Sequence, residues 1–161
     1  MIRLLLSTVG GLGLLRPAPG SWGSIPPVIL AVALAPAGPT AIIITMAVLA
    51  VVSSILCVAL APWYESHFGR TDPGEVVLDE VAGMSLCLLA VAALSPDAFV
   101  WPKVILTGVM GFVLFRVLDI TKPPPIGPMQ AAPHGWGVLI DDLAAGLIAA
   151  LFVWIIIGLA Y

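Results

Sequence analysis

Six of the nine acidic residues of this 161-residue chain gather in three short segments, each beside a long apolar stretch. A group of convergent carboxylates with no soft ligand nearby suits a hard divalent cation, and Mg²⁺ in particular keeps several waters and bridges to phosphate. Acids in a first helical turn also complement the helix dipole, so each acid taken singly has a structural alternative. The acids are Glu75, Asp79 and Glu80, then Asp119, then Asp141 and Asp142.

Two of these segments share the pattern Asp-x-x-Ala-Gly, at residues 79–83 and 142–146. In a helix the aspartate and the glycine lie on one face, and small residues one turn beyond an acid let two membrane helices approach closely. In an alanine-rich chain the same pattern can also arise by coincidence. We predict that the carboxylates of Asp79 and Asp142 share one cation, with Glu75 and Asp141 as further ligands.

Arg116, Asp119 and Lys122 are spaced by three residues, so a helix that runs through Thr121 aligns them on one side before the prolines at 123–125 end it. Arginine offers a planar fork and lysine a point charge to phosphate oxygens, and an aspartate can hold either cation in position. A cytoplasmic excess of cations is the alternative for Arg116 and Lys122, but it does not explain Asp119. The three residues beside a metal site predict binding of a phosphate monoester.

A glycine- and serine-rich segment at residues 11–24 precedes an apolar stretch. Backbone amides of such turns and of helix N-termini bind phosphate, which makes Gly20, Ser21 and Ser24 candidate phosphate contacts, with Ser24 as the expected helix N-cap. A re-entrant loop with an interfacial tryptophan is an equally consistent alternative. His134 is a candidate general base, and a structural role in its loop stays open.

The composition defines the class of protein. The chain is 61% apolar and 9% charged, against about 25% charged in a soluble domain, and no charged residue occurs between Arg16 and Glu65. It cannot cover itself with a polar surface, and it lacks the clustered cations that a nucleic-acid binder needs. Cys57 and Cys87 lie in apolar runs and are expected to pack as small hydrophobic residues.

Four apolar stretches are long enough to cross a bilayer, which needs about 20 helical residues. A fifth, at residues 25–37, is shorter and is expected to be a short or half-crossing helix near the N-terminus. The predicted fold is therefore an all-α integral membrane bundle of four to five helices, forming a single domain over residues 1–161. The four long stretches are residues 40–62, 76–95, 99–118 and 137–160.

The cations indicate which connections share a side of the membrane. If residues 25–37 cross it, residues 1–24, 63–75 and 119–136 lie on one side, and five of the six cations lie in or beside them. By the positive-inside bias, this polar side faces the cytoplasm.

Four segments, in order, resemble the phosphatidylglycerophosphatase A family of bacterial membrane lipid phosphatases. They are PAPGSWGS at 17–24, DPGEVVLDEVAG at 72–83, FRVLDITKPPPI at 115–126 and HGWGVLIDDLAAG at 134–146. The resemblance implies an all-helical, Mg²⁺-dependent enzyme of the bacterial cytoplasmic membrane. Its substrate would be a phospholipid, phosphatidylglycerophosphate, from which it removes the terminal phosphate to give phosphatidylglycerol.

The residues and the resemblance agree on the chemistry. Arg116 and Lys122 would stabilise charge on the phosphate oxygens while an activated water attacks phosphorus. The alternative is a small Mg²⁺ or proton transporter or channel that uses intramembrane carboxylates, although a transporter would be expected to place such acids near the midplane of the membrane. The oligomeric state is left open. The predicted catalytic residues are Asp79, Glu80, Asp119, Asp141 and Asp142.

Overall fold

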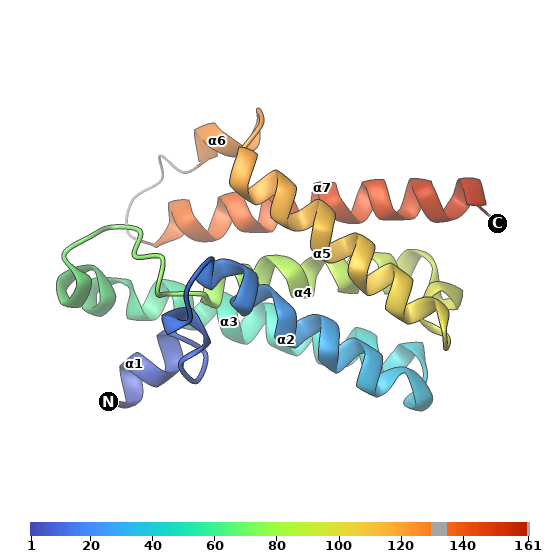
Figure 1. The fold of residues 1–161 in the computed structure, drawn as a ribbon, viewed down its shortest axis with the longest axis horizontal. Helices are drawn as coiled ribbons and strands as arrows, with labels where there is room; N and C mark the ends of the chain where they lie inside the picture. Colours follow the sequence, from blue (N-terminus) through green and yellow to red (C-terminus); the bar gives the residue numbers. More distant parts are fainter. Residues whose placement is uncertain (130–134, 161) are drawn as a thin grey trace.

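In a computed structural model, which describes residues 1–129 and 135–160, the chain is an antiparallel bundle of helices, and these residues contain no strand (Figure 1). This confirms the all-α fold class. The long helices are α2 (Pro19–Leu34), α3 (Pro39–Phe68), α4 (Leu78–Leu94), α5 (Lys103–Thr121) and α7 (Trp136–Ala160). The short ones are α1 (Ile2–Ser7), α6 (Ile126–Met129) and the 3₁₀ turns η1 (Leu12–Leu14), η2 (Ala35–Ala37) and η3 (Pro96–Phe99).

Within the part of the chain that the structure describes, four helical segments are long and apolar enough to cross a membrane. Their outward faces carry exposed apolar side chains, such as Ile44, Val51 and Ile55 on α3. In water such a surface would be a liability, whereas in lipid it is the favourable one. The chain is therefore a multi-pass membrane protein. The four segments are Pro19–Ala37, Pro39–Phe68, Lys103–Thr121 and Trp136–Leu159.

Helix α4 is the inner helix of the bundle. It packs against α2, α3, α5 and α7, and 11 of its 17 residues are buried. Because its neighbours enclose it, its polar residues face protein rather than lipid. The stretch expected at residues 76–95 thus forms a helix with nearly the expected bounds, and this helix carries Asp79 and Glu80. With 17 residues it is not among the four segments above, so the expectation that this stretch has the length to cross the membrane is not met.

The expectation of a short helix at residues 25–37, with Ser24 as its N-cap, is wrong for α2. It begins at Pro19, and with η2 it reaches Ala37, so the segment has 19 residues and the length to cross. Ser24 lies inside the helix, where its hydroxyl donates a hydrogen bond of 2.8 Å to the carbonyl oxygen of Gly20, and it is not the N-cap. The glycines that favour a loop in isolation are tolerated here because they pack closely against neighbouring segments.

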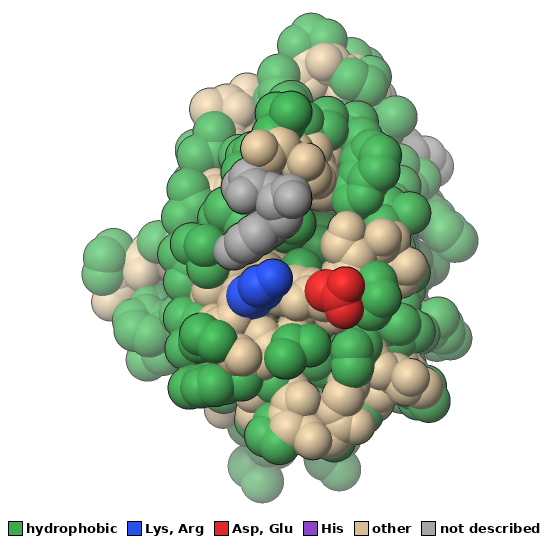
Figure 2. Space-filling model, turned by 90° about the vertical axis from the view of Figure 1, so that its right-hand side faces the viewer, with side chains coloured by type: hydrophobic (Ala, Val, Ile, Leu, Met, Phe, Trp, Pro, Cys, Tyr) green, Lys and Arg blue, Asp and Glu red, His purple; other side chains and the backbone are tan. Residues whose placement is uncertain are grey.

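The connections of the bundle fall into two groups, as the charge pattern predicts. Helices α2, α4 and α7 begin, and α3 and α5 end, at the end of the bundle where the N-terminus lies (Figure 1). The opposite end presents mainly apolar side chains, with little red or blue among the green (Figure 2). Its connection from α4 to α5 contains Asp97, and Lys103 begins α5. Polar chemistry is therefore concentrated at one end of the bundle.

Candidate active site

A group of three carboxylates, called the carboxylate group below, lies between α4 and α7. One oxygen each of Asp79, Glu80 and Asp142 lies within 4.8 Å of the others. The expected approach of Asp79 and Asp142 is confirmed. Both side chains are almost fully buried, and one oxygen of each of the three carboxylates has no hydrogen-bond partner among the described residues: Asp79 Oδ1, Glu80 Oε2 and Asp142 Oδ2. Buried, unpaired carboxylate oxygens are costly unless a cation or a donor binds them.

Two glycines bring these carboxylates together. A Cβ atom on Gly83 would lie 2.6 Å from the carbonyl oxygen of Asp142, and one on Gly146 would lie 2.2 Å from the carbonyl oxygen of Gly83. Both distances are too short for a real contact, so the backbones of α4 and α7 touch where only glycine fits. The pattern Asp-x-x-Ala-Gly is therefore a close helix crossing and not a coincidence of composition.

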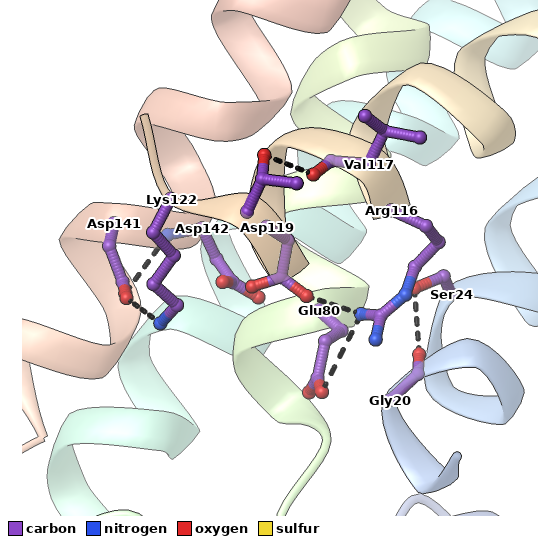
Figure 3. Close-up of polar contacts among 10 residues, drawn as sticks. Gly20, Ser24, Glu80, Arg116, Val117, Asp119, Lys122, Asp141 and Asp142 are labelled. Atoms are coloured by element: carbon purple, nitrogen blue, oxygen red, sulfur yellow. Dashed lines mark hydrogen bonds and ion pairs between the residues drawn. The ribbon is translucent and has the colours of Figure 1, made fainter. Parts of the chain in front are cut away.

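Arg116 joins the carboxylate group to helix α5. Its Nη1 lies 2.6 Å from Oδ2 of Asp119 and 3.9 Å from Oε1 of Glu80, while its Nε has no partner among the described residues (Figure 3). The three side chains are only 12–13% exposed. The spacing of three residues between Arg116 and Asp119 places them in contact, as predicted, and leaves part of the guanidinium for another acceptor.

Gly20 of α2 packs directly against the ion pair of Arg116 and Glu80. A Cβ atom there would lie 2.2 Å from Oε1 of Glu80 and 2.9 Å from each Nη of Arg116. Of the three phosphate contacts predicted on this helix, Gly20 alone lines the cavity. Ser21 does not line the cavity, and the hydroxyl of Ser24 donates its hydrogen bond to the carbonyl oxygen of Gly20. The structure thus does not bring Ser21 and Ser24 to the site.

Lys122 is the residue that follows α5, and its ammonium donates a hydrogen bond to Oδ2 of Asp141 (Figure 3). Partial burial alone would lower the pKa of Lys122, but the hydrogen bond and the charge of Asp141 outweigh it and raise the pKa above its usual value. Lys122 is therefore a permanent cation at neutral pH.

Two predicted metal ligands do not belong to the carboxylate group. Glu75 lies before the start of α4, so it does not share a helical face with Asp79, and it binds Arg70 at 2.8 Å. Asp141 binds Lys122, and its other oxygen accepts the backbone N–H of Asp142. Successive helical residues point about 100° apart, so Asp141 and Asp142 cannot both face α4.

Glu80 belongs to the carboxylate group. It was predicted as a catalytic residue but not as a metal ligand. Asp72, which was not among the predicted site residues, lines the same cavity from the connection before α4. Its position in the segment DPGE beside the acids of α4 is the one signal for it. His134 lies outside the described residues.

The carboxylates and cations line one cavity of about 330 Å³. Five carboxylates and two cations give it a formal charge of −3, so it would repel a phosphate unless a cation bound there as well. Hard carboxylate ligands beside an arginine and a lysine suit a cation and a phosphate held together. The charged residues that line it are Asp72, Asp79, Glu80, Asp119, Asp142, Arg116 and Lys122.

A membrane bundle with such a cavity at one end of its helices defines a class: an integral membrane enzyme that acts on a phosphate group. The comparisons with known proteins specify it. The sequence profile described as phosphatidylglycerophosphatase A matches residues 5–157, and the chain belongs to this family. It is thus a phosphatase, and the transporter alternative is wrong.

Three relatives are similar to the chain. The chain is 34% identical to a phosphatidylglycerophosphatase A of Haemophilus influenzae, over 94% of this chain and 86% of the relative. It is also 34% identical to a putative phosphatidylinositol-3-phosphatase of Bacteroides thetaiotaomicron, over 96% of each. A phosphatidylglycerophosphatase A of Escherichia coli is 40% identical over 51% of this chain and 43% of the relative. No solved structure shows significant similarity to the chain.

Proposed function

We propose that the protein hydrolyses the terminal phosphate monoester of phosphatidylglycerophosphate, giving phosphatidylglycerol and inorganic phosphate, with Mg²⁺ bound in the carboxylate group. The observation that carries the proposal is the meeting of Asp79, Glu80 and Asp142 within 4.8 Å in a cavity that also holds Arg116 and Lys122. Family membership supports the class of reaction, and the name that two of the three relatives carry supports the substrate.

Mg²⁺ is the cation that fits this group best. Its ligands lie about 2.1 Å away, so two ligands on opposite sides of one ion are about 4.2 Å apart. Oxygens within 4.8 Å of one another are therefore close enough for small side-chain shifts to place them around one ion. The donors are all hard oxygens, and neither cysteine of the chain lines the cavity. When bound, the ion would neutralise phosphate charge and lower the pKa of a water.

The residues of the chain would then position the phosphate and move a proton. Arg116, held by Asp119, would donate from its unpaired Nε to a non-bridging oxygen. Lys122, held by Asp141, would place a second positive charge on the phosphate. A carboxylate of the site would accept the proton of the attacking water as the new P–O bond forms and the ester P–O bond breaks. The departing lipid alkoxide oxygen would take up that proton from the carboxyl group and become the hydroxyl of the product.

The site would face the cytoplasm of a bacterial cell, from the inner membrane. Arg3, Arg16, Arg70, Arg116 and Lys122 are all at the site end of the bundle, and Lys103 is at the other, which is the bias expected for a cytoplasmic end. Single cysteines at positions 70 and 101, in a chain without its native cysteines, would test this. We expect a membrane-impermeant thiol reagent applied from the cytoplasmic side to label position 70 and not position 101.

The direct test of the function is phosphate release from a panel of lipids by the purified protein in neutral detergent micelles. We expect release from phosphatidylglycerophosphate with Mg²⁺ and none after chelation with EDTA. Release that is unchanged by EDTA would contradict the metal, and turnover of phosphatidylinositol 3-phosphate in its place would contradict the substrate.

A further inference from the structure

A second polar pocket adjoins the cavity that holds the carboxylate group, Arg116 and Lys122, which we call the catalytic cavity. It has a volume of about 280 Å³ and is lined by Arg16, Arg70 and Glu75 together with parts of η1 and of the connection from α3 to α4. Pro19 and Gly74 line both this pocket and the catalytic cavity, so the two are neighbours that share a wall. We call it the arginine pocket.

The walls of the arginine pocket support one another. A Cβ atom on Gly13 of η1 would lie 2.0 Å from the carbonyl oxygen of Glu75, so the two connections are in direct backbone contact. The backbone N–H of Val77 donates a hydrogen bond of 3.1 Å to the carbonyl oxygen of Ser7. Two segments distant in sequence thus form one wall, and the pocket is part of the packed structure at this end of the bundle.

The charge of the arginine pocket is opposite to that of the catalytic cavity. Two arginines and one glutamate give it a formal charge of +1. Both carboxylate oxygens of Glu75 accept hydrogen bonds from Nη2 of Arg70, which leaves Nη1 and Nε of Arg70 for another acceptor. Arg16 forms no ion pair within residues 1–129 and 135–160. The pocket can therefore bind an anion without a metal ion.

An apolar groove lies on the other side of η1. It has a volume of about 500 Å³ and runs along α2, lined among others by Leu12, Trp22 and Ile29. Because Leu12 lines the groove while Gly13 and Leu14 line the arginine pocket, η1 lies between them. Three cavities therefore follow one another, an acidic one, a basic one and an apolar one.

We propose that the arginine pocket binds the phosphodiester of the lipid substrate while the acyl chain lies in the groove along α2. The proposal rests on the proposed function, since it takes the terminal monoester to be in the catalytic cavity. A phospholipid such as phosphatidylglycerophosphate carries, in order, a terminal monoester, a short polar spacer, a phosphodiester and acyl chains. That order matches the order of the three cavities. Arg16 and Arg70 thus select lipids that carry two phosphates.

The test compares a lipid that has both phosphates with one that has the monoester alone. The substrates are phosphatidylglycerophosphate and phosphatidic acid with the same acyl chains, in neutral detergent micelles. The variants are Arg16→Gln and Arg70→Gln, and Arg3→Gln is the control, because Arg3 is exposed on α1 and lines neither polar pocket. If phosphatidic acid is not hydrolysed, its inhibition constant against the first lipid is measured in place of its KM.

We expect Arg16→Gln and Arg70→Gln each to raise the KM for phosphatidylglycerophosphate about 10-fold with kcat unchanged, the effect of losing one charge-assisted contact. The constants for phosphatidic acid and those of Arg3→Gln should stay as in the wild type. The unchanged kcat also shows that the variants are folded.

Each other outcome has a distinct meaning. An equal rise for both lipids, or no rise for either, would overturn the arginine pocket and leave the proposed function intact. If the wild type acts on phosphatidylinositol 3-phosphate rather than phosphatidylglycerophosphate, and Arg16→Gln raises that KM, the proposed substrate fails and the pocket stands. A wild-type protein that acts on none of these lipids contradicts both proposals.

Discussion

Asp79 on α4 and Asp142 on α7 lie 63 positions apart in the chain, yet their carboxylates come within 4.8 Å of each other. The glycine one turn beyond each aspartate makes this approach possible, since α4 and α7 touch at Gly83 and Gly146. The acids of the site therefore depend on a helix crossing that tolerates no side chain.

That crossing gives a prediction for stability. A Cβ atom on Gly146 would lie 2.2 Å from the backbone of Gly83, so Gly146→Ala should force the helices apart and destabilise the protein by about 1–3 kcal/mol, the usual effect of overpacking. Gly158→Ala in the same helix is the matched control, because no heavy atom outside the adjoining backbone of its own helix lies within 4 Å of its Cβ position. Thermal unfolding in detergent measures both. Equal melting temperatures for the two variants would contradict the crossing.

Lys122 provides a prediction that separates phosphate contacts from metal ligands. Lys122→Ala removes the cation that we propose to contact the phosphate oxygens, so kcat/KM should fall about 10²-fold or more, the scale of losing one preorganised electrostatic partner. The Mg²⁺ concentration for half activity should change little, because Lys122 carries no metal ligand. A large change in that concentration would show that Lys122 acts through the ion.

The Lys122–Asp141 pair also gives a pH dependence. Asp141 raises the pKa of Lys122 above its value of about 10.4 in an unfolded chain. Between neutral pH, where Asp141 is ionised, and about pH 10.4 the pair therefore contributes its full stability, and it loses this stability as the pH rises through the higher pKa of Lys122 in the folded protein. The difference in melting temperature between wild type and Lys122→Met should be constant from pH 7 to pH 10 and then shrink. A difference that already falls between pH 7 and pH 9 would contradict the raised pKa.

The sequence predicts the parts of the site that follow from helical periodicity. Each aspartate lies on the same helix face as the glycine four residues later, and Arg116 contacts Asp119, as predicted. These placements are correct because they depend only on the 3.6-residue repeat of the helix. Glu75 is misplaced because its position depends on where α4 begins. The Gly–Ser–Pro composition of residues 19–24 conceals the start of α2, since tertiary packing of Gly20 and Gly23 overrides the weak helix propensity of glycine.

Asp141 and Asp142 show a further limit. Helical periodicity predicts that the side chains of Asp141 and Asp142 point in different directions, but it does not predict which of the two faces α4. The packing of α7 against α4 decides that, through contacts between residues far apart in the chain. The adjacent pair is for this reason the sharpest internal comparison that the chain offers.

The central claim is that Asp142 belongs to a cation site and that Asp141 does not, and a Mg²⁺ titration of phosphate release tests it. Asp142→Asn keeps the size of the side chain and removes the charge, so activity should fall steeply and the Mg²⁺ concentration for half activity should rise at least 10-fold. Asp141→Asn should lower kcat/KM by loosening Lys122 and leave the Mg²⁺ requirement unchanged. If the two variants show the same Mg²⁺ requirement as the wild type, the carboxylate group is structural and the account of the site is wrong.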